Sequence, residues 1–332
     1  MNILFTSVGK RYYLINYFKN NLDSKIKIIS VNSSNHTSAK NYSNYFYLSP
    51  KINSNSYMKF ISSIIKKHKI GLVVPLIDID CKKLSKNIKI INKLNAILIA
   101  PPFKIVDIIL DKYKLYEFLK KNNLNTPRTY ASKKKFLYGY NKGEIKFPVI
   151  LKPRYGTSSI LTIKANGINE LDLYYKYLEQ KINYEYFNKK NHKEKIVIQE
   201  FINGTEYGLD LLNSIKKKYH SHLLKKKIEM RNGETDICKV SSKKIIKICK
   251  KISKLILHNF IVDIDMINKN KKFYIIDINP RIGGGYPFTH IAGFDMIKYL
   301  LKQVYLKKHP LKKPSINNKS ILLKDICISV ID

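Results

Sequence analysis

Apolar positions divide the first 100 residues into strand-length runs separated by helical stretches. The runs occupy residues 2–8, 26–31, 45–48, 71–76 and 96–100. A helix-like pattern lies between two of them, at residues 57–68. Strands that alternate with helices in this way indicate an α/β domain with a doubly wound sheet. The Ser7-Val8-Gly9 turn lacks a full G-x-G-x-x-G pattern, so we exclude a dinucleotide site there.

Alternating apolar residues later in the chain predict a β-hairpin over residues 261–279, with a polar turn in its middle. If the turn is centred on Lys271, Asp265 faces Asp277 across the two strands. Asn279 lies two residues beyond Asp277 and therefore on the same face. Like charges that face each other destabilise a sheet, and a divalent cation such as Mg²⁺, which prefers carboxylate and amide oxygens, would resolve the conflict. A solvated hairpin face with scattered acids is the alternative.

A second segment, residues 147–159, carries groups suited to phosphate. A short apolar strand ends near Lys152, and Gly156 lies among small hydroxyl residues before the apolar pattern resumes. A lysine on a strand supplies a cation for nucleotide phosphates, and small residues let backbone N–H groups approach phosphate oxygens. The segment is not a P-loop, because the lysine precedes the flexible stretch. In so lysine-rich a chain, a lysine without function is the alternative.

A third segment, residues 196–210, is predicted to form two strands joined by a turn at Asn203-Gly204. Glu200, Glu206 and Asp210 flank this bend. An ordinary hairpin is the alternative interpretation of these acids.

Together the three segments resemble the ATP-grasp family, in the correct order and spacing, from about residue 107 to residue 302. The metal-binding signature of that family is an acid, a spacer and then acid-x-Asn-Pro-Arg, which Asp265 and residues 277–281 match. The second and third segments resemble its phosphate-covering loop and its inter-subdomain hinge. The glycines at 283–285 resemble the branch that includes the large subunit of carbamoyl-phosphate synthetases.

The resemblance implies an α/β chain, α+β in its C-terminal part, in which a Rossmann-like pre-ATP-grasp domain precedes an ATP-grasp fold. Pro101-Pro102 and the polar stretch 184–195 interrupt the pattern and mark the expected boundaries. We therefore expect a pre-ATP-grasp domain at residues 1–103, a subdomain with the phosphate-covering loop at 104–190, and a subdomain with the hinge and metal site at 191–332. A final apolar run at 321–330 is expected to fold back as a strand.

The resemblance also implies the cofactors ATP and Mg²⁺, with Mn²⁺ as an alternative cation, and the residues that hold them. The metal ligands would be Asp265, Asp277 and Asn279, and Arg281 would be the catalytic residue that stabilises developing charge. The phosphates of ATP would contact Lys112, Lys152, Arg154, Gly156, Ser158 and Ser159. Backbone groups at Glu200, Phe201 and Ile202 would hold adenine, and the carboxylate of Glu200 or Glu206 would hold ribose.

By the same resemblance, the chain is expected to be an ATP-dependent, ADP-forming carboxylate–amine ligase. A substrate carboxylate attacks the γ-phosphate to give an acyl phosphate, and an amine or similar nucleophile then displaces phosphate. An ATP-grasp kinase or a carboxyphosphate-forming enzyme is the alternative within the fold. The expected partners are small-molecule carboxylate and amine substrates, with a homodimer left open because dimers are common among relatives.

A formal net charge of +38 is the main argument for a different class of function. The chain would then be a catalytically inactive protein that binds nucleic acid or another polyanion. Almost all of this charge is lysine, spread along the chain together with abundant Ile and Asn, as the bias of an AT-rich genome produces. Lysine runs such as residues 216–218 and 225–227 are therefore predicted to be mostly solvated faces, and no specific nucleic acid is expected. Arginine is scarce, so Arg11 and Arg231 become candidates for binding a substrate carboxylate or phosphate.

The sequence contains no run of residues that is long and apolar enough to span a membrane, and Met1 leads directly into a strand rather than a signal sequence. We therefore expect a cytoplasmic protein with no membrane partner. The four cysteines show neither metal-ligand spacing nor a paired pattern, which predicts reduced structural thiols.

Overall fold

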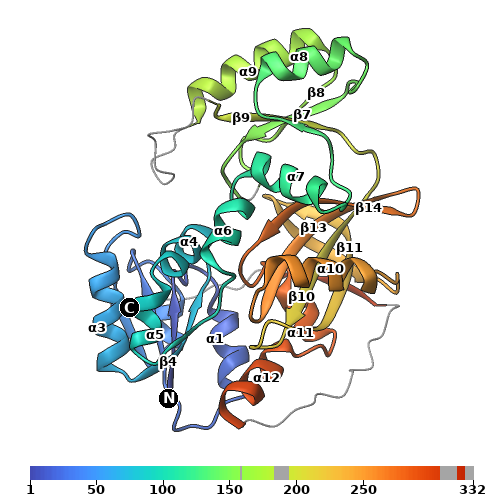
Figure 1. The fold of residues 1–332 in the computed structure, drawn as a ribbon. Coiled ribbons are helices and arrows are strands. Elements are labelled where there is room, and N and C mark those ends of the chain that lie inside the picture. The colour runs from blue at the N-terminus through green and yellow to red at the C-terminus, as the bar shows by residue number, and fades with distance from the viewer. Residues whose placement is uncertain (158, 183–193, 307–319, 326–332) are drawn as a thin grey trace.

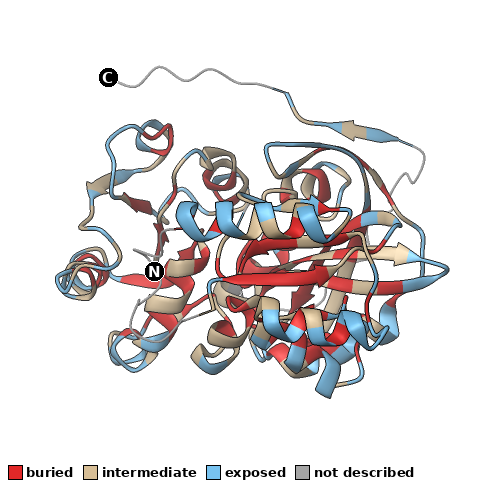
Figure 2. Cartoon of the chain, turned by 90° about the horizontal axis from the view of Figure 1, so that it is seen from above, coloured by how far each residue is buried: buried red, intermediate tan, exposed pale blue. Residues whose placement is uncertain are grey.

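Three β-sheets follow one another along the chain (Figure 1). The structure is a computed structural model, and it describes residues 1–157, 159–182, 194–306 and 320–325. Figure 2 shows that the buried residues concentrate in the strands, while the outer faces of the helices are exposed.

The first sheet is parallel, with strand order β3-β2-β1-β4-β5. Its strands are β1 (Asn2–Thr6), β2 (Ile28–Asn32), β3 (Tyr45–Leu48), β4 (Ile70–Pro75) and β5 (Ile97–Leu98). The helices between them are α1 (Tyr12–Lys19), α2 (Ala39–Tyr42), α3 (Tyr57–Lys67), α4 (Asp78–Lys86) and α5 (Ile88–Lys93). Both faces of β1 are apolar because both are covered: Ile3 and Phe5 pack into one hydrophobic cluster and Leu4 into another. The predicted doubly wound sheet is confirmed.

Two helices, α6 (Phe103–Ile109) and α7 (Lys112–Lys121), lead to a second, antiparallel sheet with strand order β6-β9-β7-β8. Its strands are β6 (Thr129–Tyr130), β7 (Val149–Pro153), β8 (Ile163–Ala165) and β9 (Ile196–Glu200). Helices α8 (Lys133–Asn141) and α9 (Ile168–Lys181) pack on this sheet (Figure 1). Among the described residues, their hydrophobic cluster takes no member from the other two sheets. The division at residues 103 and 190 stays a prediction, although β9 lies beyond residue 190 and pairs within this sheet.

The third sheet has the order β14-β13-β10-β11-β12-β15. Its strands are β10 (Thr205–Asn213), β11 (Tyr219–Arg231), β12 (Glu234–Val240), β13 (Ile261–Lys269), β14 (Lys272–Asn279) and β15 (Ile321–Leu323). Helix α10 (Ile246–Ile256) packs on one face, and α11 (Tyr286–Ile291), α12 (Met296–Leu301) and a π-helical turn (Lys302–Leu306) pack on the other. β15 is the start of the predicted last strand, whose residues 326–330 lie outside the described residues.

A shared core joins the first and third sheets. Phe5 and Phe18 from the N-terminal part pack in the same cluster as Phe260 and Tyr286 from the C-terminal part. The second sheet, with its separate core, stands above this pair in Figure 1. Polar groups from all three parts therefore meet in the space where the second sheet faces the other two.

Candidate functional site

Four polar side chains come together on the β13–β14 hairpin. Asp265 pairs with Asp277, and Asp263 pairs with Asn279, so the predicted pairing is confirmed. All four residues are partly buried, and Asn279 Nδ2 donates a hydrogen bond to Asp263 Oδ2 over 3.1 Å.

The turn that joins these two strands differs from the prediction. Asn270 and Lys271, with φ of 50° and 64°, form a two-residue turn rather than a turn centred on Lys271. Such a turn alone would pair Asp265 with Ile276. Instead, Ile276 forms a one-residue bulge, and the register shifts so that Asp265 meets Asp277. The bulge offsets the shorter turn and restores the pairing of the acids.

Burial and neighbouring charges disfavour the ionised forms of Asp277 and Asp263. Burial is the main cause that raises the pKa of Asp277, and the charge of Asp265 adds to it, against the opposing effect of nearby lysines. Burial, together with Asp265, raises the pKa of Asp263 to about 7. In the described part of the chain, no group of three or more His, Cys, Asp or Glu side chains could hold a metal ion by itself. A cation between Asp265 and Asp277 would therefore complete its shell with Asn279 and with oxygens from outside the protein.

The lysine run in β11 corrects one prediction. Of its three lysines only Lys226 is exposed, because Lys225 and Lys227 lie on the opposite side of the strand. Lys227 Nζ lies 2.6 Å from Asp265 Oδ1 and 3.8 Å from Glu206 Oε2. The prediction of a mostly solvated face is wrong for this run, since two of its ammonium groups belong to the interior of the site.

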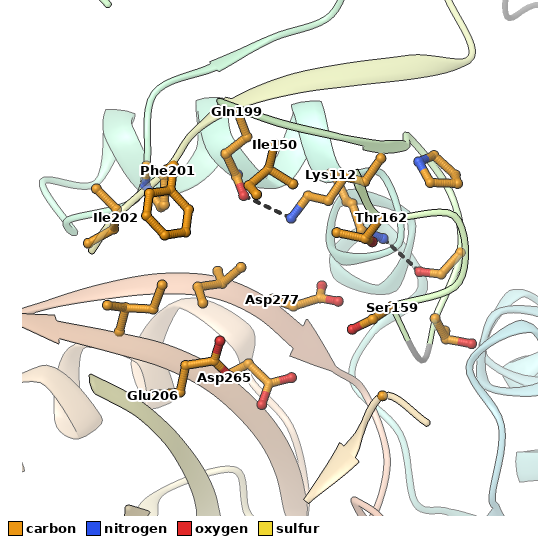
Figure 3. Close-up of a pocket in the computed structure, with 18 of the residues that line it drawn as sticks. Lys112, Ile150, Ser159, Thr162, Gln199, Phe201, Ile202, Glu206, Asp265 and Asp277 are labelled. Carbon is orange, nitrogen blue, oxygen red and sulfur yellow. Dashed lines mark hydrogen bonds between the residues drawn. The ribbon is translucent and has the colours of Figure 1, made fainter. Parts of the chain in front are cut away.

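A cavity of about 220 Å³ separates the hairpin from the second sheet. Figure 3 shows Asp265, Asp277 and Glu206 on the side of the third sheet and Gln199, Phe201 and Ile202 facing them. Of the residues predicted for the nucleotide, those that line this cavity are Lys112, Lys152, Gly156, Ser159, Glu200, Phe201, Ile202 and Glu206. Ser158 lies outside the described residues.

Two lysines carry the positive charge of the cavity on the side of the second sheet. Lys152 is only 6% exposed, and its Nζ donates a hydrogen bond to Gln199 Oε1 over 2.8 Å. Burial, with a smaller contribution from the charge of Lys112, lowers the pKa of Lys152 to about 8. Lys112 Nζ donates to the carbonyl oxygen of Gly156 over 2.6 Å. An anion between these lysines and the hairpin acids would relieve the repulsion between the two ammonium groups.

The hinge supplies the apolar end of the cavity. Phe201 and Ile202 follow directly after β9, and the ammonium group of Lys164 lies 4.4 Å from the centre of the Phe201 ring. Glu200 Oε2 accepts a hydrogen bond from the backbone N–H of Arg128, whereas Glu206 has a half-exposed side chain. Of the two predicted ribose ligands, Glu206 therefore has the more accessible carboxylate.

Arg154 lies away from the cavity, although it was predicted to contact the nucleotide. Its Nε donates to Asp111 Oδ1 over 2.8 Å, and Tyr155 donates its hydroxyl proton to Asp111 Oδ2. Asp111 is fully buried and also accepts hydrogen bonds from the backbone N–H groups of Tyr113 and Lys114, where helix α7 begins. Arg154 thus fixes the start of α7, and its contact with the nucleotide stays a prediction.

Arg281 and Asn279 line two neighbouring cavities rather than the cavity of about 220 Å³. The guanidinium of Arg281 is nearly buried, and its Nε lies 3.0 Å from Asp78 Oδ1. Burial opposes the charge of Arg281, but Asp78 and Asp263 outweigh it and raise the pKa of the guanidinium.

Comparison with known protein families identifies the family to which the chain belongs. Residues 109–285 match the model described as an ATP-grasp domain, and residues 3–99 match the model described as a PylC-like N-terminal domain. The chain belongs to the ATP-grasp family. Its resemblance to that family and the fold inferred from it are both confirmed.

Several ATP-grasp relatives are ligases. The chain is 24% identical to the carbamoyl phosphate synthase large chain of Helicobacter pylori over 282 residues, which cover 81% of this chain and 25% of that protein. It is 36% identical to the D-alanine–D-alanine ligase of Buchnera aphidicola over 114 residues, which cover 32% of this chain and 33% of the ligase. The chain thus spans about a quarter of the length of the carbamoyl phosphate synthase large chains that it matches.

Solved structures show the same ATP-grasp architecture. The biotin carboxylase domain of 2-oxoglutarate carboxylase from Hydrogenobacter thermophilus superposes with a TM-score of 0.71 at 14% identity, over 96% of this chain and 73% of that chain. An L-amino acid ligase from Bacillus licheniformis superposes with a TM-score of 0.68 at 17% identity, over 91% of this chain and 74% of that chain. None of the described helices has the length and apolar character needed to cross a membrane.

Sequence reasoning missed three residues of this ATP-grasp site: Gln199, Lys227 and Asp111. Gln199 directly precedes Glu200 on β9, so the strand pattern gave its position but not its contact with Lys152. Lys227 was missed because lysine is abundant throughout the chain. Alternation along β11 could have shown that Lys227 and Lys226 lie on opposite faces of the strand. Asp111 could have been found as an N-cap, because an aspartate before a helical pattern is a typical capping residue.

Proposed function

We propose that the chain is an ATP-dependent, Mg²⁺-dependent ligase that activates a small-molecule carboxylate as an acyl phosphate and joins it to an amine. The observation that carries this proposal is the cavity of about 220 Å³, in which two lysines on one wall face two opposed aspartates on the other. This charge arrangement suits a polyphosphate with a divalent cation, because the lysines neutralise phosphate and the cation bridges phosphate to carboxylate.

ATP would lie with its base between the hinge and the third sheet. Phe201 and Ile202 offer apolar surface and backbone groups for adenine, and Glu206 offers a carboxylate for ribose. Lys112 and Lys152 lie further along the same cavity, where they would contact the phosphates. Glu200 is bound to the backbone of Arg128, so we assign it a role in holding the hinge.

The residues of the hairpin fit a Mg²⁺ ion. Burial raises the pKa of Asp277, and among the described residues the opposed Asp265 forms an ion pair with Lys227 alone, so a divalent cation would stabilise both carboxylates. Asp265, Asp277 and Asn279 would hold the ion, which would supply charge neutralisation for the phosphates.

In the reaction that we propose, an oxygen of the substrate carboxylate attacks the γ-phosphorus of ATP, and the bond from that phosphorus to the bridging oxygen of ADP breaks. The nitrogen of the amine then attacks the acyl carbon, phosphate leaves, and the amine loses a proton. Arg281, which lines the same two cavities as Asn279, would stabilise negative charge on the transferred group. Because positioning and electrostatics dominate phosphoryl transfer, the chain needs no protein nucleophile.

The experiment that tests this proposal is thermal unfolding with ATP, with and without Mg²⁺. At a hundredfold excess over its dissociation constant, a ligand that binds only the folded state stabilises it by about 2.7 kcal/mol. We expect a rise in Tm that needs Mg²⁺ and is lost in Asp277→Asn. Asp172→Asn, a half-exposed aspartate of α9 that pairs with Lys133, is the matched control and should keep the rise. A rise that any polyanion produces without Mg²⁺ would favour the polyanion-binding alternative instead.

The proposed ligase function also implies partners and a location for the chain. We propose carboxylate and amine substrates, no specific nucleic acid, and a cytoplasmic location. A homodimer is consistent with the biotin carboxylase neighbour, which is described as a domain dimer.

A further inference from the structure

A second cavity of about 570 Å³ lies beside the nucleotide cavity and shares Lys112 and Asp277 with it. Residues from all three sheet regions line it: Arg11 and the start of α4 from the first, Tyr155 and Ile182 from the second, and Asn279 and Arg281 from the third. A molecule bound here would touch the hairpin acids, which we assign to the metal, from the side opposite adenine. The position is that of a substrate that reacts with the γ-phosphate.

Two arginines meet at one end of this cavity. Arg11 Nη1 and Arg281 Nη1 both donate to the carbonyl oxygen of Ile282, over 3.2 and 3.1 Å. Arg11 also donates to the carbonyl oxygen of Leu76 over 2.7 Å, and within the described residues its hydrogen bonds go only to neutral carbonyls. Burial and the charge of Arg281 lower the pKa of Arg11 against the smaller opposing effects of Asp78 and Glu234, as expected for two cations held close together. An anion at this end would relieve that repulsion and could accept a fork of hydrogen bonds.

The remaining wall is largely aliphatic. It contains Ile77, Ile79, Ile109, Leu110, Ile182 and Ile278. Among the described residues, the charged side chains that line it are four basic residues, Arg11, Lys112, Lys181 and Arg281, and two acids, Asp78 and Asp277. Asp78 is paired with Arg281, and Asp277 faces Asp265 on the hairpin. Neither acid is available for a substrate ammonium group, whose burial without a partner is unfavourable.

Resting on the proposed ligase function, we infer that the carboxylate substrate is an aliphatic acid without an α-ammonium group, held by Arg11 and Arg281 against the isoleucine-rich wall. Its carboxylate lies between the two guanidinium groups and the hairpin, and its hydrocarbon body extends toward Ile77 and Ile79. The amine is the second substrate and enters after the acyl phosphate has formed.

Calorimetry in the presence of Mg²⁺ and a non-hydrolysable ATP analogue tests this inference. The probes are butyrate, hexanoate, hexanamide and 2-aminohexanoate, with the full chain. Hexanoate should bind at least tenfold more tightly than hexanamide or 2-aminohexanoate. It should also bind roughly fifteenfold more tightly than butyrate, because each buried methylene contributes about fourfold. With ATP and hydroxylamine as a surrogate amine, hexanoate should yield ADP, phosphate and the hydroxamate in equal amounts.

Two variants test whether Arg11 and Ile79 contact the bound acid. Arg11→Lys keeps the charge but removes the planar fork, and it should weaken hexanoate binding about tenfold while the ATP analogue binds as before. Ile79→Asn should reduce the preference for hexanoate over butyrate. Arg231, the other arginine that the sequence offered as a substrate ligand, is not among the described residues that line either cavity, and its side chain is 59% exposed and paired with Asp236. Arg231→Lys is therefore the matched control and should change neither affinity.

The outcomes separate the two proposals. If the nucleotide analogue binds with Mg²⁺ but 2-aminohexanoate binds as tightly as hexanoate, or no acid binds, the inference is overturned and the ligase proposal stands. If Arg11→Lys leaves the affinity for hexanoate unchanged, the assignment of the acid to this cavity is overturned. If the nucleotide analogue itself does not bind, both proposals fail together.

Discussion

Lys152→Met should separate the stability of the free protein from its ability to bind nucleotide. Lys152 is buried in the second sheet, and among the described residues its ammonium group donates one hydrogen bond, to Gln199 Oε1. An ammonium group in this position weakens the folded state, and in the function that we propose it would bind a phosphate of ATP. Methionine has a similar length and no charge. The substitution therefore removes both the destabilisation caused by the buried charge and the cation that we propose for phosphate binding.

The magnitude follows from the pKa of Lys152. Its drop from 10.5 to about 8 corresponds to a destabilisation of about 3 kcal/mol at neutral pH, at about 1.4 kcal/mol for each pH unit. Loss of the hydrogen bond to Gln199 costs about 2 kcal/mol, because a buried amide oxygen is left without its partner. We therefore expect Lys152→Met to be more stable than the native chain by about 1 kcal/mol at pH 7.

The pH dependence gives the sharper test. Between pH 8 and pH 10.5 the unfolded chain retains a proton on Lys152 that the folded chain has released, so stability rises with pH across this window. Urea titrations should show that the native chain gains up to about 3 kcal/mol relative to Lys152→Met between pH 7 and pH 10.5. Lys66→Met, at an exposed lysine of α3, is the control and should follow the native curve. Parallel curves for native chain and Lys152→Met would refute the reasoning.

Three further changes test other parts of the structure. Asp111→Asn removes the charge that binds Arg154, so we expect the free energy of unfolding in urea to fall by about 1–3 kcal/mol; no loss would contradict the role of this contact. Burial lowers the pKa of His258 to about 3, so the unfolded chain binds the extra proton between pH 3 and pH 6.5, and stability decreases as the pH is lowered from 6.5 toward 3. His258→Gln should flatten this fall in urea titrations from pH 6.5 to pH 4, and an equally steep fall would argue against it. Lys227→Met frees Asp265 from its ammonium partner, so Mg²⁺ without nucleotide should raise Tm more than in the native chain; an equal rise would exclude competition.

Most of the fold could be predicted because its elements obey simple periods. Strands buried on both faces appear as apolar blocks, and the run predicted at residues 71–76 lies within one residue of β4, whose residues are all buried. The pairing of the hairpin acids could be predicted from a turn centred on Lys271, because beyond Ile276 the register is the one that such a turn would give. The two-residue turn and the bulge at Ile276 could not be predicted, because their effects on the register cancel at the acids.

Contacts between distant segments could not be predicted from the sequence. Arg154 lies beside Lys152 in a phosphate-binding pattern, yet its guanidinium turns to Asp111, 43 residues earlier, and no local pattern records that choice. The meeting of Arg11 with Arg281 on the carbonyl of Ile282 likewise depends on the core shared by the first and third sheets. The scarcity of arginine pointed to these residues, but only the fold brings them together.

The bulge at Ile276 also determines how this hairpin can change in length. Ile276 is the unpaired residue, so deleting it alone would remove the bulge and leave Asp277 opposite Asp265 and Asn279 opposite Asp263. An added residue in either strand without a new bulge would instead move these side chains to the other face of the sheet. A relative that lacks the bulged residue can therefore keep the same acid pairs, whereas counting from the turn in this chain would misassign the metal-site acids by one residue.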